Sequence, residues 1–151
     1  MKYTETQIVF QEVPDEVALA INISGCPVRC PGCHSPHLAG DIGTALDIVS
    51  LSALIDANPG ISCVSFMGGD ADPASVAVLA AYVHDLGLKT CWYSGRDLEH
   101  ATAVLPHLDY IKVGPYMQEL GGLASPETNQ RFYRIGHSRI IDDLTARFKS
   151  K

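Results

Sequence analysis

Short apolar runs and segments with helical signals alternate along the chain. Four apolar runs, each followed by a glycine within two residues, predict buried strands at 17–23, 61–67, 89–93 and 109–113. Apolar spacing and capping residues predict helices over 45–58 and 73–86 and from an Asp97 cap to about 105, with Asp72 as a second cap and Pro73 in a first helical position. An edge hairpin within 1–13, a late strand at 130–135 and a terminal helix over 139–148 complete the predicted elements.

This alternation predicts parallel βαβ units in a single domain that spans residues 1–151. A closed eight-stranded barrel needs ~250 residues, so we expect an α/β fold whose sheet is an open, partial (β/α) barrel of minimal length. The carboxyl ends of parallel strands share one edge of the sheet, and ligands bind there. Segments 26–33, 68–70, 94–96 and 112–114 follow or end the predicted strands, so we expect them to converge on one site.

Charge and hydropathy narrow the class of protein. The net charge is −6, and the 11 Lys and Arg residues are scattered, which argues against a nucleic-acid partner. The N-terminus lacks the pattern of an export signal, and no apolar stretch approaches the length needed to span a membrane. We therefore expect a cytoplasmic protein with no membrane partner.

Three of the five cysteines, Cys26, Cys30 and Cys33, lie in one short segment directly after a predicted strand. An odd number of cysteines in a reducing compartment favours metal or redox ligands over a disulfide framework. Thiolates are the preferred ligands of zinc and iron–sulfur clusters, and a cubane cluster held by three of them leaves one iron open. The other two, Cys63 and Cys91, lie inside apolar strands and are expected in the core.

Three other interpretations fit the cysteine segment. Cys30 and Cys33 match a thioredoxin-like dithiol, but that function leaves Cys26 without a role. The segment also reads as a haem c attachment signature, which belongs to exported proteins. Structural zinc, bound by the three thiolates and either His34 or His37, is the serious alternative.

The spacing C-x-x-x-C-x-x-C is specific to the radical S-adenosylmethionine superfamily, and the chain resembles its members. Many members carry an aromatic residue before the last cysteine and Gly-Gly-Glu after the second strand, whereas this chain has Gly32 and Gly68-Gly69-Asp70. In these details, and over nearly its whole length, it resembles the activating proteins of anaerobic ribonucleoside-triphosphate reductase. The segments that carry the resemblance are 22–26, 30–34, 66–70, 92–96 and 128–131.

The resemblance implies that Cys26, Cys30 and Cys33 bind a 4Fe-4S cluster whose open iron takes S-adenosylmethionine. It implies reductive cleavage of that cofactor and formation of a glycyl radical on the large subunit of the reductase, with electrons from a small reducing protein such as flavodoxin. Activation of another glycyl-radical enzyme, or a radical reaction on a small molecule, is the alternative within the same class. A non-catalytic zinc or electron-carrier module is the alternative from a different class.

Five further residues are candidates for binding the cofactor. In the family the turn at Gly68 and Gly69 meets the methionine amino group, and Asp70 either adds a carboxylate there or caps the next helix. Ser94 is placed for the ribose hydroxyls, although an ordinary turn serine would look the same. Lys112 either pairs with the cofactor's carboxylate or is an exposed lysine.

The remaining polar and aromatic residues have weaker assignments. We expect His84, His100 and His107 at the surface without partners, and Trp92 and Tyr93 in the core or along the cofactor pocket. Strand closure and partner docking both fit the segment Asn129-Gln130-Arg131, and Arg96 fits the site and a solvated loop equally. The sequence does not distinguish among electron donors or oligomeric states.

Overall fold

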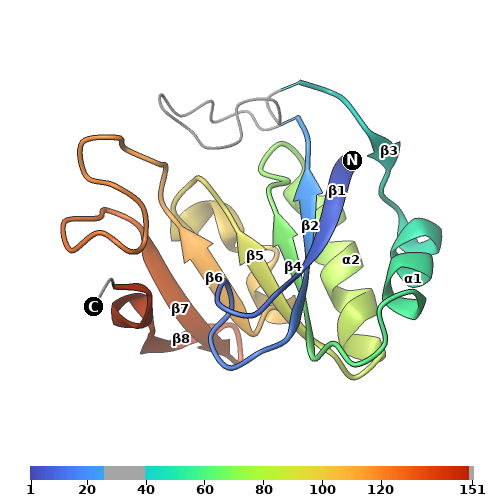
Figure 1. Ribbon diagram of the computed structural model, residues 1–151. Coiled ribbons are helices and arrows are strands. Elements are labelled where there is room, and N and C mark those ends of the chain that lie inside the picture. The colour runs from blue at the N-terminus through green and yellow to red at the C-terminus, as the bar shows by residue number, and fades with distance from the viewer. Residues whose placement is uncertain (26–39, 150–151) are drawn as a thin grey trace.

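The computed structural model describes residues 1–25 and 40–149. Its eight strands form one sheet in the order β3-β1-β2-β4-β5-β6-β7-β8 (Figure 1). The four central strands run parallel to one another and confirm the four predicted strands, with small shifts at their ends. They are β2 (Ala18–Ile23), β4 (Cys63–Met67), β5 (Lys89–Tyr93) and β6 (Tyr110–Val113).

Antiparallel strands flank this parallel centre. On one side β1 (Lys2–Val9) pairs with β2, and the short β3 (Thr44–Ala45) pairs with β1. On the other side β7 (Arg131–Gly136) pairs with β6, and β8 (Arg139–Asp143) pairs with β7. The described chain is thus mixed α/β with a largely antiparallel periphery, and the partial barrel of the radical S-adenosylmethionine type stays a prediction.

Two α-helices among the described residues pack on one face of the sheet (Figure 1). The helix α2 (Pro73–Asp85) begins as predicted, with the Asp72 side chain accepting from the Ser75 amide. The helix α1 (Ile48–Asp56) begins later than the predicted residue 45, because Asp47 and Ser50 form a reciprocal capping box. Neither helix combines the length and the apolarity that a membrane crossing requires.

Two predicted helices were wrong. The one after Asp97 is replaced by short 3-10 helices, η2 (Leu98–Ala101) and η3 (Leu105–His107), and Pro106 lies in the first turn of η3. The terminal segment forms β8 and a 3-10 turn, η4 (Thr145–Phe148), instead of a helix. His137 and Ser138, with φ of 51° and 64°, form the two-residue turn that favours a hairpin here.

The expected hairpin within 1–13 was also wrong, because β1 pairs with β2.

Both faces of the sheet carry a buried cluster. The helix side holds Leu19, Ile21, Val64, Phe66, Trp92 and Ile111, packed against residues of α1 and α2 that include Leu51, Val76, Leu79 and Val83. The opposite face holds Ala18, Ala20, Cys63, Cys91, Tyr110 and Phe132.

Cys63 and Cys91 are buried core residues, as predicted. Burial in this apolar layer raises the pKa of the Cys91 thiol to about 12 and raises the pKa of Cys63 further. Both thiols are therefore protonated at neutral pH and are poor metal ligands or nucleophiles.

Candidate functional site

The four parallel strands end level with one another. Asn22 pairs with Met67, Met67 with Tyr93, and Tyr93 with Lys112, so one row of residues crosses the sheet near its carboxyl edge. The described segments that follow these strands therefore lie along a single edge (Figure 1), as the sequence predicted for 68–70, 94–96 and 112–114, whereas the predicted segment 26–33 is outside the described residues. The described segments are Ser24-Gly25, Gly68–Asp70, Ser94–Arg96 and Gly114.

The cysteine triad itself, with His34 and His37, lies outside the described residues. The described chain on either side of it is closely joined, because the Gly25 amide donates to the Gly40 carbonyl at 2.8 Å. Ser24 is buried beside this junction, and its Oγ donates to the Ile42 carbonyl at 2.6 Å. The chain thus leaves the carboxyl end of β2 and returns at the same point.

Residues 1–25 and 40–149 contain no group of three His, Cys, Asp or Glu side chains that could hold a metal ion. The metal ligands that the sequence predicts, Cys26, Cys30 and Cys33, are not among these residues. Three thiolates are a donor set that suits an iron–sulfur cluster with one open iron, and with a nearby histidine they suit zinc equally.

Gly68 and Gly69 form a tight turn with φ of 116° and 97°. A Cβ on Gly68 would lie 2.9 Å from the Ile23 carbonyl oxygen, and one on Gly69 would lie 2.7 Å from Cγ2 of Val76. Both glycines are thus required by packing against β2 and α2, before any ligand is considered.

All three carbonyl groups of the turn 68–70 have partners. The Gly68 oxygen accepts from Trp92 Nε1 at 2.7 Å, and the Gly69 oxygen accepts from the Asp72 amide at 3.0 Å. The Asp70 oxygen lies 3.1 Å from Nε2 of His100. A carbonyl oxygen has two lone pairs, so a second hydrogen bond to each of these groups is chemically possible.

The carboxylate of Asp70 is buried and binds the next loop instead of capping α2, a role that belongs to Asp72. Its two oxygens accept from Ser94 Oγ at 2.5 Å and from the Gly95 amide at 2.8 Å. The Ser94 hydroxyl in turn accepts from the Arg96 amide at 3.1 Å. Asp70 and Ser94 therefore lock two strand ends together, and contact of either residue with a cofactor stays a prediction.

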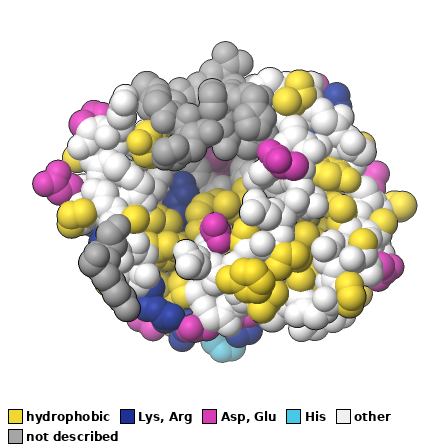
Figure 2. All heavy atoms as spheres, in the orientation of Figure 1, with side chains coloured by type: hydrophobic (Ala, Val, Ile, Leu, Met, Phe, Trp, Pro, Cys, Tyr) yellow, Lys and Arg dark blue, Asp and Glu magenta, His cyan; other side chains and the backbone are white. Residues whose placement is uncertain are grey.

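Lys112 is only 9% exposed, so the reading of it as an exposed lysine was wrong. Its Nζ donates to the Gly114 carbonyl at 3.1 Å and lies 5.9 Å from the centroid of the Tyr93 ring. It projects on the sheet face opposite the helices, as does Tyr93. Figure 2 shows this side of the molecule hollowed near its centre, where basic and hydrophobic side chains meet.

The segment 129–131 closes the loop before β7. Asn129 Nδ2 donates to the Pro115 carbonyl at 3.0 Å, and the Arg131 guanidinium donates to the carbonyls of Thr128 and Gln130 at 3.0 and 2.8 Å. The backbone of Arg96 also lies at the carboxyl edge of the sheet, where its carbonyl accepts from the Gly114 amide at 2.7 Å. These contacts favour strand closure as the role of 129–131.

Two histidines expected at the surface without partners have them. His84 Nε2 lies 2.7 Å from Asp109 Oδ2 and 3.1 Å from Thr90 Oγ1, near the amino ends of β5 and β6. His100 meets the 68–70 turn. Sequence carried no signal for either contact, because the partners are 6 to 30 positions away and are joined only by the fold.

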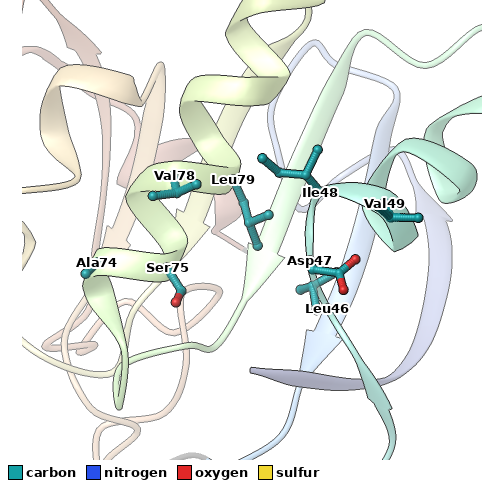
Figure 3. A pocket seen from close by; sticks show the side chains of 8 residues that line it. All are labelled: Leu46, Asp47, Ile48, Val49, Ala74, Ser75, Val78 and Leu79. Carbon is teal, nitrogen blue, oxygen red and sulfur yellow. The ribbon is translucent and has the colours of Figure 1, made fainter.

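A second hollow, of about 560 Å³, lies between α1 and α2 (Figure 3). Its walls are mostly aliphatic, and its polar side chains, Asp47 and Ser75, are engaged in helix caps. It offers no convergent polar groups, so the carboxyl edge remains the candidate site. The residues lining the hollow are Leu46, Asp47, Ile48, Val49, Ala74, Ser75, Val78 and Leu79.

Comparison of the chain with family models, with curated proteins and with solved structures finds no match in any of the three.

Proposed function

We propose that this protein is a radical S-adenosylmethionine activase that generates a glycyl radical on anaerobic ribonucleoside-triphosphate reductase. One observation carries the proposal. The end of β2, which leads directly into the cysteine triad, lies on the same edge as the Gly68–Asp70 turn and the buried cation Lys112. A metal centre, a set of carbonyl acceptors and a cation would thus lie on one edge, where they could bind one small zwitterionic ligand.

The chain's own residues supply binding and orientation in this proposal. The free lone pairs of the turn carbonyls accept from the ammonium of the methionine moiety, and Lys112 pairs with its carboxylate. Asp70 and Ser94 hold the two loops at a fixed spacing around the ligand. Cys26, Cys30 and Cys33 anchor the 4Fe-4S cluster.

A 4Fe-4S cluster held by these cysteines and reduced by a donor such as flavodoxin would supply the one electron needed to cleave S-adenosylmethionine to methionine and an adenosyl fragment. The chain's own residues would orient that fragment toward the glycine of the partner from which a hydrogen atom is to be taken. The difficult chemistry belongs to the cofactor, which is compatible with a chain of 151 residues. Cytoplasmic location and a reductase partner belong to the same proposal.

The first test is anaerobic reconstitution with iron and sulfide, followed by assays of iron content and of 5′-deoxyadenosine release. Cys26→Ala, Cys30→Ala and Cys33→Ala should each abolish cleavage, while Cys63→Ala, a matched cysteine in the core, should retain the cluster. Full cleavage by any of the three variants contradicts the ligand assignment. Stoichiometric zinc with no spectral response to S-adenosylmethionine would favour the structural zinc module.

The second test identifies the enzyme that the activase acts on. Mixing the reduced protein and S-adenosylmethionine with the reductase from the same source should give a doublet glycyl-radical signal in electron paramagnetic resonance, together with reductase activity. Replacing the radical glycine of the reductase by alanine should abolish the stable signal. If a cleavage-competent activase leaves the reductase inactive but activates another glycyl-radical enzyme, the partner is wrong and the superfamily assignment stands.

A further inference from the structure

We infer that His100 is a positioning residue for the Gly68–Asp70 turn, acting through a hydrogen bond from its ring to the Asp70 carbonyl. His100 Nε2 lies 3.1 Å from that carbonyl oxygen, which can only accept. Nε2 therefore carries the hydrogen, and the tautomer of the neutral ring is fixed. The nearer carboxylate oxygen of Asp70 is 3.9 Å away, so the backbone carbonyl is the direct partner.

The ring of His100 is itself held in place. The η2 segment begins at the Asp97 cap, whose side chain accepts from the His100 amide at 3.2 Å. The His100 ring lies 6.2 Å from the ring of Trp92, measured between centroids, and the planes are tilted by 33°. Contacts other than the turn thus help to orient the imidazole, as a positioning group requires.

Trp92 and His100 act on the turn as a pair. The indole donates to the first carbonyl, at Gly68, and the imidazole donates to the third, at Asp70. A turn with two glycines at positive φ has a permissive backbone, so the two side-chain donors help to fix the directions of its first and third carbonyls, while the second accepts from the Asp72 amide. Without His100, the end of the turn that carries the Asp70 carboxylate loses one of its anchors.

The consequence concerns the ligand of the proposed site. If the turn receives S-adenosylmethionine, His100 lowers the ordering cost of binding by keeping the acceptors in one arrangement. The identity of this ligand rests on the proposed function, whereas the positioning of the turn does not. One measurement therefore tests the positioning of the turn by His100, and a second tests its effect on S-adenosylmethionine binding.

The variants are chosen to separate the donor from the bulk of the ring. His100→Leu removes the donor, and His100→Gln keeps an N–H at the place of Nε2. His100→Asn is polar but too short to reach, and it serves where the leucine variant does not fold. His107→Leu, on the neighbouring η3, is the matched control, because that ring has no contact with the turn among the described residues.

The first measurement is amide hydrogen exchange of Gly95 and Asp72 in the cofactor-free protein, since both amides donate to the turn. Exchange should accelerate by about threefold to tenfold in His100→Leu and His100→Asn, and stay near wild type in His100→Gln and His107→Leu. Unchanged exchange in both donor-less variants, or no rescue by glutamine, would overturn the positioning role.

The second measurement is S-adenosylmethionine affinity of the anaerobically reconstituted protein. The donor-less variants should bind about threefold to tenfold more weakly than wild type, and His100→Gln should recover most of that loss. Equal affinity in all variants would refute the effect on the ligand. Failure of the wild-type protein itself to bind would refute the proposed function, and the exchange data would still decide the role of His100.

Discussion

Asp70 and Ser94 form a buried pair in which the serine hydroxyl donates to the carboxylate at 2.5 Å across the ends of two neighbouring strands. The second carboxylate oxygen accepts from the Gly95 amide at 2.8 Å, so one side chain fixes both the position and the direction of the loop after β5. Both Asp70 and Ser94 are almost fully buried. This pair makes the carboxyl edge rigid where a ligand is proposed to bind.

Removing the Asp70 carboxylate should destabilise the protein strongly. Asp70→Ala leaves the Ser94 hydroxyl and the Gly95 amide without their charged acceptor, and hydrogen bonds to charged groups contribute about 1.5–3 kcal/mol. Denaturant unfolding should therefore show a loss of about that size. Asp85→Ala, which changes an exposed aspartate near the end of α2, should alter the free energy of unfolding by less than about 0.5 kcal/mol. A similar small effect for both variants would show that the pair adds little stability.

Gly69→Ala should also lower stability, since its Cβ would meet Cγ2 of Val76 at 2.7 Å and its φ is 97°. Gly60 offers a matched control, because its φ is 91° and a Cβ there would meet nothing within 4 Å. Unfolding of Gly60→Ala measures the cost of the backbone alone, about 1–3 kcal/mol. Gly69→Ala should cost more, and the difference measures the clash with α2. Equal losses would mean that Val76 moves aside freely.

Lys112 should govern affinity for S-adenosylmethionine through its charge. Lys112→Met keeps much of the aliphatic stem but removes the ammonium, so binding to the reconstituted protein should weaken by at least about tenfold if the cofactor's carboxylate pairs with it. Lys89→Met, in which a lysine at the opposite ends of the strands changes, should leave the affinity near wild type. Equal binding by the two variants would remove Lys112 from the site.

Acid should weaken the cap of α2. The hydrogen bonds from Ser75 to Asp72 hold the pKa of the Asp72 carboxyl below its ordinary value of 3.8. Stability from this carboxylate is therefore complete above that ordinary value and is lost as pH falls through the lower pKa of the folded state. Unfolding curves recorded from neutral pH to about pH 2 should show a shallower acid loss in Asp72→Asn than in the wild-type protein. Parallel curves would assign the acid loss to other groups.

The four parallel strands could be predicted because each is a short apolar run followed by a glycine within two residues. The cap Asp72 could be predicted because Pro73 follows it directly. The terminal segment was misread because Ile140, Leu144 and Phe148 recur at helical spacing. In the structure Ile140 is exposed on an edge strand while Leu144 is buried, so the periodicity was accidental.

Unlike the strands and the helix cap, the contacts of the candidate site join residues that are far apart in the sequence. Asp70 and Ser94 are 24 positions apart, and His100 is 30 positions from its carbonyl partner. Such pairs depend on the order of strands in the sheet, which no local pattern encodes. Sequence could place these residues on one edge, but it could not show that they bind one another.

Trp92 is the only tryptophan in the chain, and its indole donates to the Gly68 carbonyl. Excitation at wavelengths longer than the tyrosine absorption band therefore gives emission from one indole, which lies at the candidate site. Any event that displaces the turn should change the emission wavelength or intensity of this single residue. Trp92 fluorescence can therefore report ligand binding at the carboxyl edge without an added label.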